Sequence, residues 1–151
     1  MPKIGVMIEV PAIIFQLNSI IKDIDFISIG SNDLTQYLMA VDRNNEKVSN
    51  LYNPLHPSMV HILKQIADIS KTNHVDLSIC GEIAANPIAI PLLLGIGIHT
   101  LSMNSISIPQ AKWIIRHINH SDCKILASEV LQLSDKDRAH PTLANTKYLF
   151  E

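Results

Sequence analysis

Residues 28–43 read SIGSNDLTQYLMAVDR and place polar side chains directly behind a short apolar strand. The small and apolar residues at 26–29 suit a buried strand, and Gly30 interrupts it. We therefore expect Asn32 and Asp33 in the loop just beyond the carboxyl end of that strand. In barrels and open parallel sheets this edge carries the active site. The stretch thus predicts an α/β protein with a site at this point.

Strand and helix patterns alternate on both sides of this stretch. Short apolar runs indicate strands at residues 4–8, 26–29, 75–80 and 100–103. Apolar residues at helical spacing indicate helices at residues 11–21, 58–69, 87–94, 109–118 and 123–133. Residues 34–43 suit a short helical turn or ordered loop, and 44–57 a polar, turn-rich connection. Four βα repeats imply parallel strands joined by right-handed crossovers.

Length and composition argue against several classes of protein. The chain has 151 residues, enough for one core but short of the ~250 of a closed eight-stranded α/β barrel. Its formal net charge of -2, without a dense run of Lys or Arg, argues against a nucleic-acid partner. It has no apolar run of ~18 residues and no signal-peptide pattern, so we expect no membrane association and a cytoplasmic location. Cys80 and Cys123 have neither metal-ligand spacing nor disulfide density.

The start of the chain favours a longer natural unit. Only three residues precede the apolar run at 4–8, and a buried strand needs neighbours on both sides. We therefore expect the structural unit to extend upstream and the chain to be a C-terminal portion of it. Within the chain we expect a βα region at residues 1–119, a helix at 120–134 and a polar, weakly periodic tail at 135–151.

Polar residues follow the expected strands one after another. Glu9, Asn32 with Asp33, Cys80 and Asn104 each fall at the carboxyl end of a successive strand and should share one face. Two carboxylates there, Glu9 and Asp33, could hold Mg²⁺, because this cation takes a few oxygen ligands and leaves positions for substrate. The alternative is that Glu9 is an exposed strand-end charge and Asp33 a helix N-cap.

Two further residues could take part in chemistry at this face. Arg43 could return to the site as a phosphate clamp, since its guanidinium presents a planar fork of donors. The alternative is a solvent-facing pair with Asp42 or Glu46. The Cys80 thiol could act as a proton donor or nucleophile, or could be a small buried hydrophobic residue.

Taken together, these motifs resemble a known enzyme family. GVMIEVP, SIGSNDLTQYLMAVDR, LYNPLHP, CGE and IPLLLGIGI occur at residues 3–116 in the order and spacing of the phosphoenolpyruvate-protein phosphotransferases. These are enzyme I of the sugar phosphotransferase system and its nitrogen-regulatory paralogue. The resemblance is to their C-terminal phosphoenolpyruvate-binding domain, a (β/α)8 TIM barrel. It implies that residues 1–119 hold the last four βα units, half of the barrel.

The resemblance also implies roles for the candidate residues. Glu9 and Asp33 match the family's Mg²⁺ ligands, Asn32 with Asp33 the segment that holds the phosphate of phosphoenolpyruvate, and Arg43 a phosphate-binding arginine. Cys80 matches the general acid that protonates the enolate to give pyruvate. The phosphoryl acceptor is a histidine in an N-terminal part of the family's proteins, which docks a phosphocarrier protein of HPr type. Full-length relatives form homodimers, and this chain alone should not complete the phosphotransfer.

The sequence also departs from the family pattern and leaves alternatives open. Residues 83–87, IAANP, follow CGE where the family usually has a Gly and a carboxylate, and Gln110 stands where Arg is common. One alternative is a part of pyruvate phosphate dikinase or phosphoenolpyruvate synthase. A second is a Mg²⁺-dependent aldolase or lyase that stabilises a pyruvate enolate and does not need Cys80. A third is a non-catalytic, truncated gene product.

Overall fold

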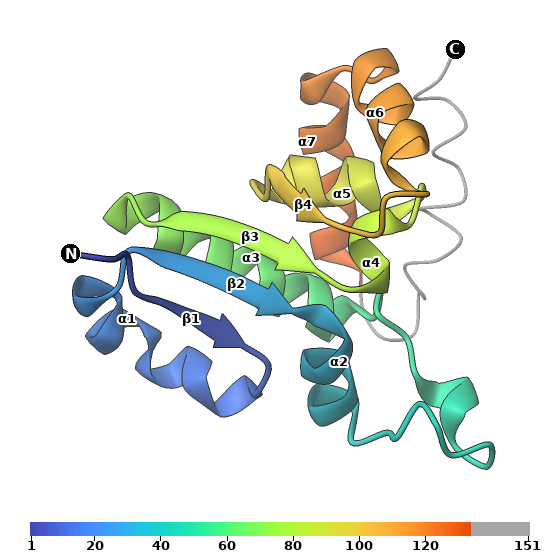
Figure 1. The fold of residues 1–151 in the computed structure, drawn as a ribbon. Helices are drawn as coiled ribbons and strands as arrows, with labels where there is room; N and C mark the ends of the chain where they lie inside the picture. The colour runs from blue at the N-terminus through green and yellow to red at the C-terminus, as the bar shows by residue number, and fades with distance from the viewer. Residues whose placement is uncertain (134–151) are drawn as a thin grey trace.

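The protein is an α/β structure built around one parallel sheet (Figure 1). The coordinates are a computed structural model, and the structure describes residues 1–133. The sheet has the strand order β1-β2-β3-β4. Its strands are β1 Gly5–Ile8, β2 Phe26–Gly30, β3 Asp76–Cys80 and β4 Thr100–Ser102. All three strand pairs are parallel, so every carboxyl end lies at the same edge.

Helical segments connect the strands and cover the sheet. In the first half of the chain they are η1 Pro11–Gln16, α1 Leu17–Ile20, η2 Ile21–Asp23, α2 Ser31–Met39 and η3 Ser49–Leu51. In the second half they are α3 Pro57–Asn73, α4 Glu82–Ala85, α5 Ala89–Ile96, α6 Ile108–His117 and α7 His120–Gln132. Figure 1 shows α3 running behind β2 and β3, whereas α5, α6 and α7 gather beyond β4.

The core lies between the sheet and these helices. Ile27 and Ile29 on β2 and Ile79 on β3 are fully buried, and Ile29 pairs with Ile79 across the sheet. From the helices, Met59 and Leu63 of α3 pack into the same cluster. Near-continuous apolar strands of this kind are typical of parallel sheets, whose faces are covered by crossover helices.

The four expected strands and their parallel arrangement are confirmed, while some helix predictions were wrong. Residues 11–21 are helical but divide into η1, α1 and η2, because Ile-rich, β-branched sequence is a poor continuous helix former. Helix α2 begins directly at Ser31, so Asn32 and Asp33 lie in its first turn and not in a loop. The short helix α4 had no counterpart among the predictions.

Helix α7 docks against α5 at an unusually close approach. A β-carbon on Gly95 would lie 2.0 Å from the backbone oxygen of Cys123, which leaves room there only for glycine. Gly95 therefore lies inside α5 as a packing residue, one position beyond the helix predicted at residues 87–94. Gly97 ends the helix in the left-handed conformation. The predicted tail at residues 135–151 lies outside the described residues.

No helix in the described part of the chain combines the length and apolar character needed to cross a membrane.

Candidate functional site

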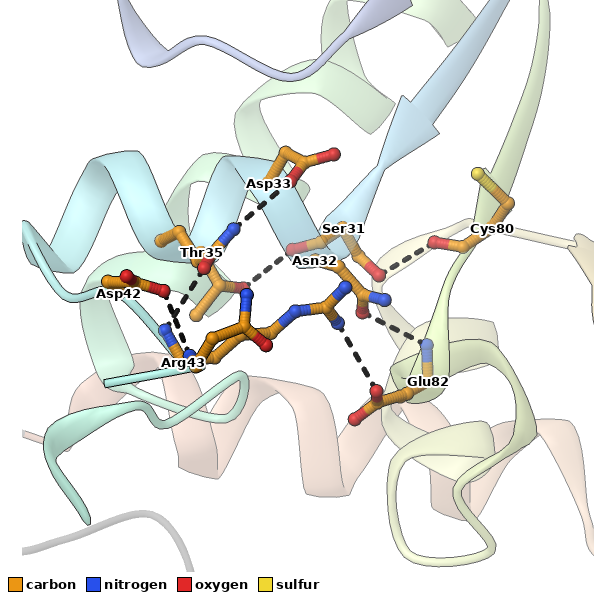
Figure 2. Close-up of polar contacts among 10 residues, drawn as sticks. Ser31, Asn32, Asp33, Thr35, Asp42, Arg43, Cys80 and Glu82 are labelled. Atoms are coloured by element: carbon orange, nitrogen blue, oxygen red, sulfur yellow. Dashed lines mark hydrogen bonds and ion pairs between the residues drawn. The ribbon is translucent and has the colours of Figure 1, made fainter. Parts of the chain in front are cut away.

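The start of α2 is tied to the end of β3 by side-chain hydrogen bonds. The Ser31 hydroxyl donates to the backbone oxygen of Cys80 at 2.6 Å. The Thr35 hydroxyl, one turn later, donates to the backbone oxygen of Ser31 at 2.7 Å. Both residues are buried. The first turn of α2, with Asn32 and Asp33, is therefore held at a fixed position beside Cys80 (Figure 2).

The orientation of the Asn32 amide follows from one backbone contact. The Glu82 N–H donates to Asn32 Oδ1 at 3.1 Å. Because an N–H can only donate, the amide oxygen must face Glu82 and the NH2 group must face the other way. Gly81 makes this approach possible: its φ is +109°, and a β-carbon there would lie 2.8 Å from Asn32 Oδ1 and 2.3 Å from Ser31 Oγ.

An open cavity of about 490 Å³ lies at the carboxyl ends of the strands. Asn32, Cys80 and Asn104, predicted to share one face, all line it, from the ends of β2, β3 and β4. Asn86 and Ser102 add further polar groups to its wall. The half-buried Cys80 donates its S–H to the backbone oxygen of Ile29 at 3.4 Å. The cavity thus combines amide and hydroxyl groups with one thiol and the Glu82 carboxylate.

The two candidate metal ligands lie beside the end of β2. A β-carbon on Gly30 would lie 2.7 Å from Glu9 Oε1, so the Glu9 carboxylate sits directly over this glycine. Asp33 follows three residues later, and its Oδ1 accepts a hydrogen bond from Gln36 Nε2 at 3.1 Å. Neither carboxylate is among the described residues that line the cavity.

The donor set of these two carboxylates suits Mg²⁺. Among residues 1–133 there is no group of three or more His, Cys, Asp and Glu side chains that could hold a metal ion. The described chain would therefore supply only two hard oxygen ligands, Glu9 and Asp33. Magnesium is commonly bound by one or two carboxylates, with water and substrate phosphate completing its shell.

Arg43 pairs with a residue far away in the sequence. Its Nη1 donates to Glu82 Oε1 at 3.3 Å, whereas the expected alternatives were its neighbours Asp42 and Glu46. The backbone N–H of Arg43 donates to Gln36 Oε1 at 3.0 Å. Gln36 therefore bonds both Asp33 and the Arg43 backbone, and the loop after α2 is joined to the candidate metal ligand.

The hydroxyl of Tyr52 is buried next to this pair. Within the described residues its oxygen has no hydrogen-bond partner. Burial raises the pKa of Tyr52, and the Thr35 hydroxyl, the Glu82 carboxylate and Arg43 change it by smaller, partly opposing amounts. Thr35 and Arg43 are thus close to the hydroxyl, without a hydrogen bond of good geometry.

Sequence reasoning overlooked five residues of this region, which share a role in positioning others. They are Ser31, Gln36, Tyr52, Gly81 and Glu82. All five lie inside the quoted motifs, and the clearest signal was the glycine directly after the strand-end Cys80, since Gly at such a point often marks a close approach of two backbones. Ser31, Tyr52 and Glu82 make contacts over distances in the chain that periodicity cannot predict, whereas Gln36 bonds Asp33 within α2.

A larger cavity, of about 680 Å³, lies at the opposite end of the sheet. Its basic residues are Lys64, Lys71, Lys124, His99 and His120. Burial, followed by the positive charges around it, lowers the pKa of His99. The basic side chains are mostly exposed, and none of the predicted site residues reaches this end.

Comparison with known proteins identifies relatives that match most of the chain. The model of the family described as PEP-utilising enzyme, PEP-binding domain, matches residues 1–120. The phosphoenolpyruvate-protein phosphotransferase of Haemophilus influenzae is 44% identical over 149 residues, which are 99% of this chain and 25% of that protein. The corresponding protein of Buchnera aphidicola subsp. Acyrthosiphon pisum is 48% identical over 131 residues, 87% of this chain and 23% of the relative.

An Escherichia coli strain K12 protein named for the phosphoenolpyruvate-dependent phosphotransferase system is 45% identical over 131 residues. These are 87% of this chain and 18% of that protein, so the chain spans about a fifth to a quarter of the relatives' length. The resemblance seen in the motifs is confirmed, and the chain belongs to the family of PEP-utilising enzymes, matching their PEP-binding domain.

Proposed function

We propose that this chain forms part of a phosphoenolpyruvate-protein phosphotransferase, which transfers the phosphoryl group of phosphoenolpyruvate to a protein histidine and releases pyruvate. The observation that carries the proposal is the cavity at the carboxyl edge of the sheet. Asn32, Cys80 and Asn104 reach it from three successive strand ends, in a chain of the PEP-utilising family. In α/β proteins this edge is where substrates bind.

The proposed architecture is half of an eight-stranded barrel. Four consecutive βα units with strand order β1-β2-β3-β4 supply half of the eight strands that a closed (β/α)8 barrel requires. In the described residues β1 and β4 are the two edges of the sheet, where the remaining four units would pair. The division into residues 1–119, 120–134 and 135–151 remains part of this proposal.

In the proposed site the phosphate of phosphoenolpyruvate lies against the start of α2. The Asn32 NH2 group, turned away from Glu82, is a donor for a phosphate oxygen. Arg43 is positioned by its bond to Gln36 and can add a forked pair of donors. Donors fixed before the substrate arrives stabilise the charge of the transferring phosphoryl group without reorganisation.

Glu9 and Asp33 would hold Mg²⁺ beside this phosphate. The bound cation would supply Lewis-acid neutralisation of phosphoryl oxygen charge. The two side chains themselves need only be ionised and fixed. Gln36 fixes Asp33 by a hydrogen bond, and Gly30 leaves the space in which the Glu9 carboxylate lies.

Cys80 is the proposed proton donor for pyruvate formation. Once the phosphoryl group has left, the enolate carries its excess electron density on the methylene carbon. The S–H bond of Cys80 breaks, a C–H bond forms at that carbon, and the thiolate regains a proton from solvent. The thiol donates to the Ile29 carbonyl at 3.4 Å, which orients its S–H bond before the step.

The remaining parts of the proposal concern partners. The acceptor histidine and a phosphocarrier of HPr type would come from parts of the protein outside this chain, which spans about a quarter or less of its relatives. Homodimerisation and a cytoplasmic location are expected of the complete enzyme.

A chimera tests the proposed function. The matched segment of the Haemophilus influenzae phosphotransferase would be replaced by this chain, and pyruvate release measured with phosphoenolpyruvate, Mg²⁺ and carrier protein. We expect the chimera to release pyruvate, Cys80→Ser to abolish that release, and Cys123→Ser to retain it. The isolated chain should phosphorylate nothing. Full activity of the Cys80→Ser chimera would contradict the proposal.

A further inference from the structure

Glu82 stands between Arg43 and the cavity. Its carboxylate accepts from Arg43 Nη1, and Glu82 itself lines the cavity, whereas Arg43 is not among the described lining residues. The Glu82 backbone N–H also fixes the Asn32 amide. One residue thus contacts both groups that we propose as phosphate contacts, with its backbone on one and its side chain on the other (Figure 2).

The Arg43–Glu82 ion pair contributes little to fold stability. The side chain of Glu82 is 72% exposed and that of Arg43 is 34% exposed. Pairs this accessible to water stabilise a fold very little, because solvent screens the two charges. The 3.3 Å contact joins one guanidinium nitrogen to one carboxylate oxygen, so this ion pair uses only part of the donor fork that an anion could bind.

A phosphate that approaches this site meets two effects of the same carboxylate. It must compete with Glu82 for the Arg43 guanidinium, and it is repelled by the Glu82 charge on the cavity wall. A phosphate group carries more charge and more acceptor oxygens than a carboxylate, so it is the stronger partner for the arginine fork. A ligand with only a carboxylate, which carries less charge than a phosphate, would displace Glu82 less readily.

We propose that Glu82 is a positioning residue that acts as the exchangeable counter-ion of Arg43, holding the guanidinium at the cavity until a phosphate group displaces it. The inference rests on the proposed function, because it takes Arg43 as a phosphate contact. Glu82 thereby lowers the affinity of the site for anions in general and selects for phosphate. The neighbouring Tyr52 hydroxyl, buried without a partner in the described structure, lies where the exchange occurs.

Calorimetric titration of the full chain with phosphoenolpyruvate and Mg²⁺ tests this role. Glu82→Gln keeps the backbone N–H to Asn32 and removes the charge, so we expect binding to tighten by about two- to fivefold. Arg43→Gln should weaken binding, and adding Glu82→Gln to it should change nothing further. Glu82→Asp should restore affinity close to that of the wild type. Asp68→Asn, which removes an equal charge from the distant Lys64–Asp68 pair, should have no effect.

The outcomes distinguish the counter-ion role of Glu82 from the phosphate-binding role of Arg43. If Arg43→Gln weakens binding but Glu82→Gln does not tighten it, or Asp68→Asn tightens it equally, the counter-ion role is wrong and the phosphate site stands. If Arg43→Gln leaves the wild-type affinity unchanged, or the wild type binds no phosphoenolpyruvate, the phosphate role of Arg43 fails and the counter-ion role fails with it.

Discussion

Cys80 and Cys123 show how two residues of one type acquire different properties from their surroundings. Cys80 is half-buried at the wall of the carboxyl-edge cavity and donates to the Ile29 carbonyl. Cys123 is 0% exposed beneath α5, and burial, followed by the nearby Asp122 charge, raises the pKa of its thiol. Only the first can meet a substrate, because a thiol buried among apolar groups neither ionises nor contacts solvent.

This difference predicts selective labelling of the folded protein. With Ellman's reagent in neutral buffer, we expect Cys80 to react in the native state and Cys123 only after unfolding in denaturant. The Cys80→Ser variant should show no native-state reaction, which mass spectrometry of the labelled peptides would verify. Equal rates for the two thiols in native protein would contradict the described burial of Cys123.

Gly30 allows the metal assignment to be tested without changing a ligand. Its φ of -83° suits any residue, but a β-carbon there would lie 2.7 Å from Glu9 Oε1 and 2.6 Å from Glu9 Cγ. Gly30→Ala should therefore displace the flexible Glu9 side chain and weaken Mg²⁺-dependent binding of phosphoenolpyruvate, while unfolding free energy changes by less than about 1 kcal/mol.

Calorimetry with and without Mg²⁺ and urea unfolding would measure the two effects of Gly30→Ala. Glu9→Gln serves as the reference for complete loss of the ligand charge. Unchanged Mg²⁺ dependence in Gly30→Ala, together with loss in Glu9→Gln, would show that the carboxylate does not need the position described here.

Among the helices, α5 and α7 can pack as closely as they do because Gly95 has no side chain. Gly95 lies inside α5, and a β-carbon there would lie 2.0 Å from the Cys123 oxygen and 2.9 Å from the β-carbon of Ala127. In an exposed helix interior, Gly→Ala stabilises by about 1 kcal/mol. Here the backbone contact cannot relax without moving one helix away from the other.

Gly95→Ala should therefore destabilise the protein by about 1–3 kcal/mol, opposite in sign to the helix propensity effect. Urea unfolding monitored by the fluorescence of Trp113 would measure the change. Ser128→Ala, an exposed site on α7, is a control that should shift stability by less than about 0.5 kcal/mol. A stabilised Gly95→Ala variant would show that α5 and α7 are not in such close contact.

Elements differ in how far the sequence could predict them. The strands were predictable because each is a short segment rich in apolar residues, either continuous, as at 4–8, or alternating with polar residues, as at 75–80. The parallel direction of the strands alone places Asn32, Cys80 and Asn104 at one edge of the sheet. The start of α2 at Ser31 was not predictable, because its anchor is the Cys80 carbonyl, 49 residues away.

The same reason explains which site residues were missed. Glu82 acts by contacts that depend on the tertiary arrangement, such as its ion pair with Arg43, 39 residues away. Gln36 instead joins Asp33, in its own helix, to the Arg43 backbone in the loop that follows. Glu9 and Asp33 could be proposed as a pair from their strand ends. Only the structure reveals their arrangement around Gly30, because it depends on how the Glu9 side chain lies over the end of β2.

For the whole molecule, the parallel sheet separates two chemically different ends. The carboxyl end has a polar cavity lined by amide and hydroxyl groups, the Cys80 thiol and the Glu82 carboxylate, and it lies beside Glu9, Asp33 and Arg43. The amino end has the larger cavity with Lys71, Lys124 and His99. An anionic substrate could in principle bind at either end. Family membership and the strand-end geometry favour the carboxyl end, although its cavity is smaller and less basic.

The most direct measurement is a titration of ¹⁵N-labelled chain with phosphoenolpyruvate and Mg²⁺, followed by amide chemical shifts, which detect weak binding. We predict that the shift changes concentrate at the carboxyl edge, at Asn32, Gly81, Glu82 and Asn104, and shrink when Mg²⁺ is omitted. Changes concentrated instead around Lys71, His99 and Lys124 would place the substrate at the opposite end of the sheet and contradict the proposed site.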